Sequence, residues 1–139
     1  MAITTKQPGD TITAADINDL QSQINNIQAG PSEVAFFLDG NVYVATNIVY
    51  RLMGSDATIT RVWGRIVTAP SGADLQIDIN LNGVSILNTV LTITDGTNSA
   101  NTTDLATTVL SAGDWFSMDI DQIGSSTPGA KLAVTIQLS

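Results

Sequence analysis

Two stretches in which every second residue is apolar constrain the fold of this chain more than any other feature. From Asp74 to Asn82 the odd-numbered residues are Leu or Ile and the even-numbered ones are Asp, Asn or Gln. Near the C-terminus the apolar positions of the same pattern are Leu132, Val134, Ile136 and Leu138. Since successive side chains of a β-strand point to opposite faces, both stretches predict strands with one buried and one solvated face.

Turn signals divide the rest of residues 31–139 into further strands. Asn82-Gly83 is a strong hairpin signal, and Asp39-Gly40-Asn41 predicts another hairpin between residues 34–38 and 42–44. The polar tract 94–104 fits either a surface loop or an exposed edge strand, and Gly64 marks a bulge or a close backbone approach. Further strands are expected at residues 48–53, 57–68, 84–87, 90–93, 105–110 and 115–120. This spacing predicts a mainly β chain that forms an antiparallel β-sandwich, with a jelly roll as the preferred topology.

A helical period precedes the sandwich, in residues 13–30. Thr13 and Asp16 have the spacing of a capping box, and Gly30-Pro31 ends the pattern. The apolar residues form one narrow stripe, the a/d seam of two heptads: Ile17, Leu20, Ile24 and Ile27. A single copy of the helix would leave this apolar seam exposed to solvent, so we expect a short coiled-coil helix in a homo-oligomer. Ile at both a and d of the second heptad favours a trimer, whereas the first heptad also suits a dimer.

Residues 1–12 have no periodic apolar face. Thr4, Thr5, Pro8 and Gly9 discourage a helix there, so we expect an extended arm. The predicted organisation is therefore an arm at 1–12, a trimeric coiled-coil helix at 13–30 and a jelly-roll sandwich at 31–139.

The composition excludes several functions. Thirteen acidic and five basic residues give a net charge of −8, which repels nucleic-acid phosphates and anionic lipids. The chain has neither His nor Cys, so the commonest general base, a Ser-His-Asp arrangement and zinc–thiolate sites are missing. We expect no enzyme, no cofactor and no metal. No signal peptide or long apolar run is visible, so we expect a soluble protein made in the cytoplasm.

Three runs of this sequence resemble parts of tailed-bacteriophage virion proteins. TAPSGADLQIDINLNGVSIL (68–87) and LSAGDWFSMDIDQIGSSTPGAKLAVTIQL (110–138) look like a jelly-roll module of phage fibre heads, receptor-binding tips and capsid-decorating fibres. GDTITAADINDLQSQINNIQ (9–28) is similar to linkers that precede trimeric phage fibre domains. The resemblance implies a homotrimer on the virion surface, with the major capsid protein or another virion protein as its partner.

Within that family, we expect a capsid decoration or head-fibre protein that is anchored by its N-terminus. The alternative is a receptor-binding tail fibre or tail-tip protein that recognises a host glycan or surface protein. A sugar-binding module from another source would fit the fold but explains the heptads and the arm less well. The residues expected to anchor the chain are Ala2, Ile3, Thr4, Thr5, Lys6, Gln7 and Pro8.

Several other side chains are candidates for binding. Host contact is expected at Tyr43, Trp63, Asn98 and Asn101. Trp63, Trp115, Tyr43 and Tyr50 could together stack on a sugar, although packing inside the fold or between subunits is commoner for aromatic residues. Asp78, Asn80, Asp119 and Asp121 could offer oxygen ligands to calcium, although solvated strand positions explain them better. Arg51, Arg61 and Arg65 either pair with acidic residues of another subunit or capsid, or lie on a solvated face.

Overall fold

The computed structural model describes residues 9, 11, 13–27 and 33–139. The chain divides into two compact units, Met1–Gly30 and Pro31–Ser139, which are treated separately below. The expected anchoring residues 2–8 lie outside the described residues.

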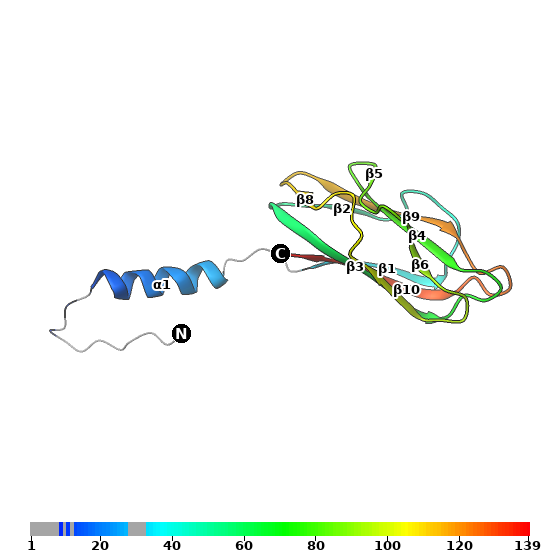
Figure 1. The fold of residues 1–139 in the computed structure, drawn as a ribbon, viewed down its shortest axis with the longest axis horizontal. Helices are drawn as coiled ribbons and strands as arrows, with labels where there is room; N and C mark the ends of the chain where they lie inside the picture. The colour runs from blue at the N-terminus through cyan, green and yellow to red at the C-terminus, as the bar shows by residue number, and fades with distance from the viewer. Residues whose placement is uncertain (1–8, 10, 12, 28–32) are drawn as a thin grey trace. The chain divides into compact units, whose positions relative to one another are not determined.

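The described residues of the first unit include the helix α1 (Ala14–Ile27) (Figure 1). It begins with the predicted capping box: the Thr13 backbone N–H donates to Asp16 Oδ2 (2.8 Å), and the Asp16 N–H donates to Thr13 Oγ1 (3.3 Å). Ile17 and Leu20 are exposed in the single chain, while the side chains of Ile24 and Ile27 lie outside the described residues. The coiled coil therefore stays a prediction. No described helix is long and apolar enough to span a membrane.

The second unit is mainly β and consists of two antiparallel sheets stacked as a sandwich (Figure 1). In sheet A the strands follow the order β1-β10-β3-β7, and β8 also pairs with β3. In sheet B the order is β2-β9-β4-β5, and β6 also pairs with β4. The strands of sheet A are β1 (Glu33–Asn41), β3 (Ala57–Thr68), β7 (Ser99–Thr102), β8 (Val109–Leu110) and β10 (Ala130–Leu138). Those of sheet B are β2 (Tyr50–Leu52), β4 (Leu75–Leu81), β5 (Val84–Ser85), β6 (Leu91–Ile93) and β9 (Trp115–Gln122).

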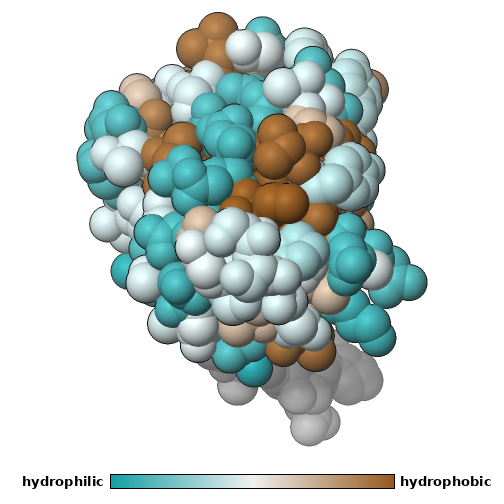
Figure 2. Space-filling view, turned by 90° about the vertical axis from the view of Figure 1, so that its right-hand side faces the viewer, coloured by the Kyte–Doolittle hydropathy of each residue, from teal (hydrophilic) through white to brown (hydrophobic). Residues whose placement is uncertain are grey.

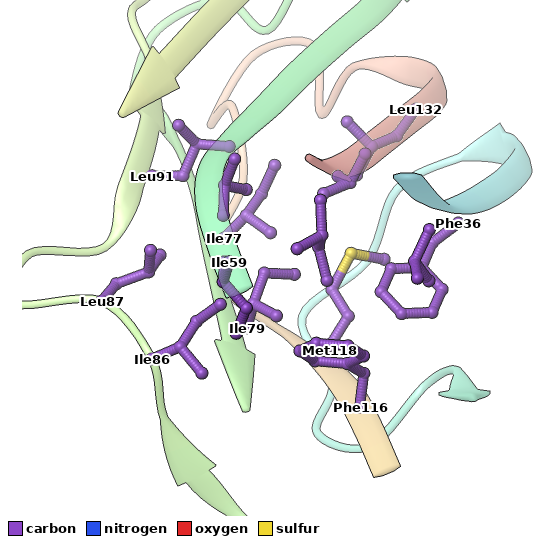
Figure 3. Packing of buried hydrophobic residues seen from close by; sticks show 14 of the residues in the cluster. Phe36, Ile59, Ile77, Ile79, Ile86, Leu87, Leu91, Phe116, Met118 and Leu132 are labelled. Carbon is purple, nitrogen blue, oxygen red and sulfur yellow. The ribbon is translucent and has the colours of Figure 1, made fainter. Parts of the chain in front are cut away.

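The core lies between the two sheets and is built from alternate residues of their long strands. Both predicted alternations are confirmed, because their apolar residues are buried in β4 and β10. Figure 3 shows side chains of both sheets in this interior, among them Phe36 and Leu132 of sheet A and Ile79, Phe116 and Met118 of sheet B. Each such side chain contributes roughly 1.5–3 kcal/mol through the apolar surface it buries.

The predicted turn at residues 39–41 is wrong. Asp39, Gly40 and Asn41 belong to β1, which pairs with β10 and not with residues 42–44. The register shifts between Leu38 and Asn41, and Gly40 has φ of 73°. A glycine with positive φ serves a bulge as well as a turn, and here the chain then leaves sheet A and bridges Ala45 to Ile120 of sheet B.

The structure agrees with the predictions for the Asn82-Gly83 turn, for Gly64 and for the polar tract 94–104. The Asn82-Gly83 hairpin is confirmed: Leu81 pairs with Val84, and both turn residues have positive φ (52° and 84°), as a type I′ turn requires. Gly64 is a close approach, since a Cβ there would come within 2.9 Å of Leu91 Cδ2. The polar tract 94–104 contains the edge strand β7.

The two ends of the sandwich differ in what they carry. Glu33 pairs with Gln137, so the first and last strands begin and finish at the same end. The opposite end, called the far end here, carries the loops 42–49, 69–74, 94–98 and 123–129 (Figure 1). Backbone hydrogen bonds join these loops: Ser71 N donates to Thr127 O (2.9 Å), and Gly96 N donates to Pro70 O (2.8 Å). Figure 2 views this end and shows hydrophobic residues gathered near its middle, with hydrophilic and neutral ones around them.

Candidate functional site

The outer face of sheet A brings together exposed aromatic, apolar and basic side chains. Strand register places them in three rows that run across the sheet. The rows are Glu33–Gln137–Arg61, Ala35–Thr135–Trp63–Asn101 and Phe37–Ala133–Arg65–Ser99. Since residues directly opposite in neighbouring strands share a face, all of these side chains point away from the core.

This face exposes large apolar side chains. Phe37 is 73% exposed, Val67 is 70% exposed and Trp63 is 42% exposed. Ala133 and Thr135 of the central strand β10 are small, so the surface sinks between the larger residues on either side. Large exposed apolar side chains gathered on one face often mark an interaction site.

Two shallow hollows lie side by side on the face and share Ala133. One, of ≈ 430 Å³, is lined by Trp63, Gly64, Arg65, Ser99, Ala133 and Thr135. The other, of ≈ 290 Å³, is lined by Phe37, Leu38, Asp39, Val67, Lys131, Leu132 and Ala133. Both are open depressions that suit a partner's side chains better than an enclosed small molecule.

Trp63 is held in place by its neighbours. The Arg61 guanidinium lies 5.0 Å from the centroid of the Trp63 ring, a cation–π contact worth about 0.5–1 kcal/mol at an exposed site. The Trp63 Nε1–H donates to Gln137 Oε1 (3.3 Å). Such contacts restrict the side chain before binding, which lowers the entropy cost of using it in an interface.

Basic residues are concentrated here. Arg61, Arg65 and Lys131, three of the five basic residues in a chain of net charge −8, lie on this face. Among the described residues none of the three forms an ion pair. Arg51, by contrast, is on β2 of sheet B, so the three arginines of the sequence hypothesis do not lie together.

The outer face of sheet B is acidic and partly aromatic. Asp78 of β4 lies directly opposite Asp119 of β9. Burial, together with the negative charges of Asp78 and Asp119, raises the pKa of Asp121 above its ordinary value. Tyr50 of β2 and Trp115, the first residue of β9, stack with ring centroids 5.1 Å apart, away from Asp119 and Asp121 along β9.

Asp78 and Asp119, two of the three carboxylates on this face, have partners within the fold. Ser85 Oγ donates to Asp78 Oδ1 (2.5 Å), and Asn80 Nδ2 donates to Asp119 Oδ2 (2.9 Å). The Asn47 N–H donates to the other oxygen of Asp119 (2.7 Å). In the described part of the chain no group of three or more acidic residues is placed to hold a metal ion. These contacts give the acidic residues a role in holding the sheet together.

The side chains expected to contact a host lie in different places. Trp63 and Asn101 are paired across β3 and β7 on the outer face of sheet A. Tyr43 is exposed in the segment between β1 and β2. Asn98 Nδ2 donates to the backbone oxygens of Ile66 (2.9 Å) and Val67 (3.0 Å), so its amide is engaged in the fold.

The aromatic residues do not form one platform, because Trp63 lies on sheet A, whereas Tyr50 and Trp115 lie on sheet B. Sequence reasoning missed Phe37 and Lys131 as members of a surface with Trp63. Alternation within each strand could have shown that Phe37 points outward. Only the pairing of β1, β10 and β3 places the three residues on one face.

No family model matches this chain, and no curated protein matches it.

Proposed function

We propose that this chain is a non-enzymatic structural protein of a tailed-bacteriophage particle, a capsid decoration protein with a trimeric jelly roll. It is made in the host cytoplasm and resides on the virion surface. The order of strands in the two sheets is the observation that carries the proposal.

A jelly roll is a long antiparallel hairpin rolled into two sheets, so its strands pair in a nested manner: first with last, second with next to last, and so on. The pairs β1–β10, β2–β9, β3–β7 and β4–β6 have this nesting, with β5 and β8 as short additions. Each sheet contributes four of these eight strands. The nesting therefore supports a jelly roll over other Greek-key sandwiches.

The helix supports oligomerisation. α1 has 14 residues, about 21 Å of helix, and isolated helices of that length are marginal in water. Its exposed Ile17 and Leu20 are better covered by other copies than left in solvent. A trimer, with Ile24 and Ile27 completing the seam, is the oligomer that the heptads favour.

The sandwich suits display on a surface. Its N-terminal strand starts at the end where the C-terminal strand finishes, so an N-terminal attachment presents the loops of the far end outward. This is the arrangement that a capsid decoration protein needs.

A receptor-binding tail fibre or tip is the second candidate. The far-end loops support it, because they are tied to one another by backbone hydrogen bonds and include the exposed Tyr43 and Val44. Host glycan or surface protein would then bind at that end. The same N-terminal arm would attach the chain to a tail protein.

Localisation of the protein on intact particles separates the two candidates. Gold-labelled antibody against the chain is expected to decorate heads, and purified protein is expected to bind capsids that lack it. Deletion of residues 1–12 should abolish capsid binding. As a control, a variant that carries an unrelated segment, as long as the deleted one, fused after residue 139 should bind capsids normally. Label confined to tails would overturn the decoration proposal in favour of receptor binding.

A further inference from the structure

We infer that the outer face of sheet A is where copies of this chain meet, with the β1 side of one copy packed against the β3 side of the next. The inference rests on the proposed trimer and names the surface that forms it. A contact between copies would account for three features of this face: its exposed apolar side chains, its separated charges and its two hollows.

The first feature is exposed apolar surface. Phe37 and Val67 are largely exposed, although both lie in long strands of sheet A. Aromatic residues and Arg are enriched at interfaces, and Trp and Arg are frequent energetic hot spots there. Phe37, Trp63, Arg61 and Arg65 supply this combination on one face.

The second feature is a separation of charge across the face. Glu33 and Asp39 lie on β1, whereas Arg61 and Arg65 lie on β3, with β10 between them. Strands are spaced by about 4.8 Å, so about 10 Å separates the backbones of β1 and β3. The guanidinium groups form no ion pair with any described residue. When β1 of one copy approaches β3 of the next, carboxylate and guanidinium groups meet.

The third feature is shape. Ala133 and Thr135 leave two adjoining hollows between Phe37 on one side and Trp63 with Arg65 on the other. An exposed Phe37 of a neighbouring copy is a suitable occupant for such a depression, since a buried aromatic anchor in a shallow pocket is a common interface element.

The contact joins two different parts of one face and is therefore heterologous. Heterologous contacts close into rings when the rotation between copies allows it. A ring of three is the symmetry that three parallel α1 helices would share. The outer face of sheet B is a weaker candidate, because two of its carboxylates, Asp78 and Asp119, already accept hydrogen bonds from Ser85, Asn80 and Asn47.

Charge reversal with rescue tests the inference on the full-length chain. We expect Arg61→Glu with Arg65→Glu to raise the protein concentration needed for the trimer by roughly tenfold or more, as measured by sedimentation velocity. Glu33→Arg with Asp39→Arg should have a similar effect. The fourfold variant restores opposite charges between copies and should recover most of the lost association. Arg51→Glu on sheet B is the control and should leave association unchanged.

An apolar pair of variants provides an independent test if charge reversal impairs folding. Val67→Ser on the face and Val84→Ser on β5 remove equally exposed side chains (70% and 68%), and only the first should weaken association. Circular dichroism and thermal unfolding establish that each variant is folded.

The outcomes are distinct. A trimer that withstands both charge reversals and Val67→Ser overturns this inference and leaves the proposed trimer intact. A monomeric full-length chain overturns both. Loss of heparin binding in the Arg61→Glu/Arg65→Glu variant, with association unchanged, would assign the face to an anionic glycan and overturn the inference.

Discussion

Ser117 offers a sharp test of the packing on sheet B. Its side chain is fully buried, and its Oγ has no hydrogen-bond partner among the described residues. A buried hydroxyl without a partner costs about 1–3 kcal/mol relative to its hydrated state in the unfolded chain. Ser117→Ala removes that cost and leaves almost the same volume, so we expect it to stabilise the fold by about 1–2 kcal/mol.

The same chemical change at Ser85 should have the opposite sign. Ser85 Oγ donates to Asp78 Oδ1 (2.5 Å) and accepts from the Leu87 N–H (3.1 Å). Ser85→Ala leaves both groups without this partner, so a loss of about 1–2 kcal/mol is expected. In a domain of this size 1 kcal/mol moves the Tm by about 4 °C.

Thermal unfolding at one fixed protein concentration measures both variants, since association makes the Tm depend on concentration. Ser117→Ala is expected to raise the Tm by about 4–8 °C and Ser85→Ala to lower it by a similar amount. A lower Tm for Ser117→Ala would mean that its hydroxyl is hydrogen-bonded, and the reasoning from packing on this face would be refuted.

Four further predictions concern a glycine, two carboxylates and a helix cap. Gly124→Ala should destabilise the fold by about 3 kcal/mol, because an added Cβ would clash with the Thr127 backbone oxygen and the backbone must shift. Burial and two neighbouring carboxylates raise the pKa of Asp121, so its charge destabilises the fold at neutral pH, and Asp121→Asn should raise the Tm at pH 7 but not at pH values well below 3.8. Two hydrogen bonds lower the pKa of Asp114, so Asp114→Asn should lower the Tm at pH 7, a loss that fades as pH falls below 3.8. Thr13→Ala should reduce helix stability by about 1 kcal/mol, seen as lower helicity by circular dichroism.

Matched controls accompany these tests. Gly54→Ala adds a Cβ where no atom lies within 4 Å, so it should change the Tm little. Equal losses for Gly124→Ala and Gly54→Ala would contradict the argument from the clash. Shifts of the same sign for Asp121→Asn and Asp114→Asn at pH 7 would contradict the stated pKa directions.

Local patterns in the sequence predicted local structure well. The alternation around Ile77 and Ile79 identified β4, and Asn82-Gly83 identified its hairpin, because side-chain period and turn chemistry are properties of neighbouring residues. Gly40 misled for the same reason: positive φ suits a turn and a bulge equally, and only pairing with β10 decides between them.

The candidate site on the outer face of sheet A was harder to predict from the sequence. Trp63 stood out by its type, but its neighbours Phe37 and Arg65 come from strands whose adjacency depends on β10 lying between them. Which strands lie next to one another depends on segments that are distant in the sequence, so the residue pattern of a single strand does not predict it. The structural role of Asn98 was also not predictable, because its amide donates to backbone oxygens of β3, a strand distant in sequence.

The pairing of the first strand with the last has a consequence for synthesis. β1 leaves the ribosome early but has no partner in sheet A until β10 has followed, so this sheet forms only after the whole chain is available. Pairings between distant segments are slow to form and expose strand edges meanwhile. Since the face that joins β1, β10 and β3 exists only in the finished domain, truncated and nascent chains lack it, and assembly through this face would admit completed subunits alone.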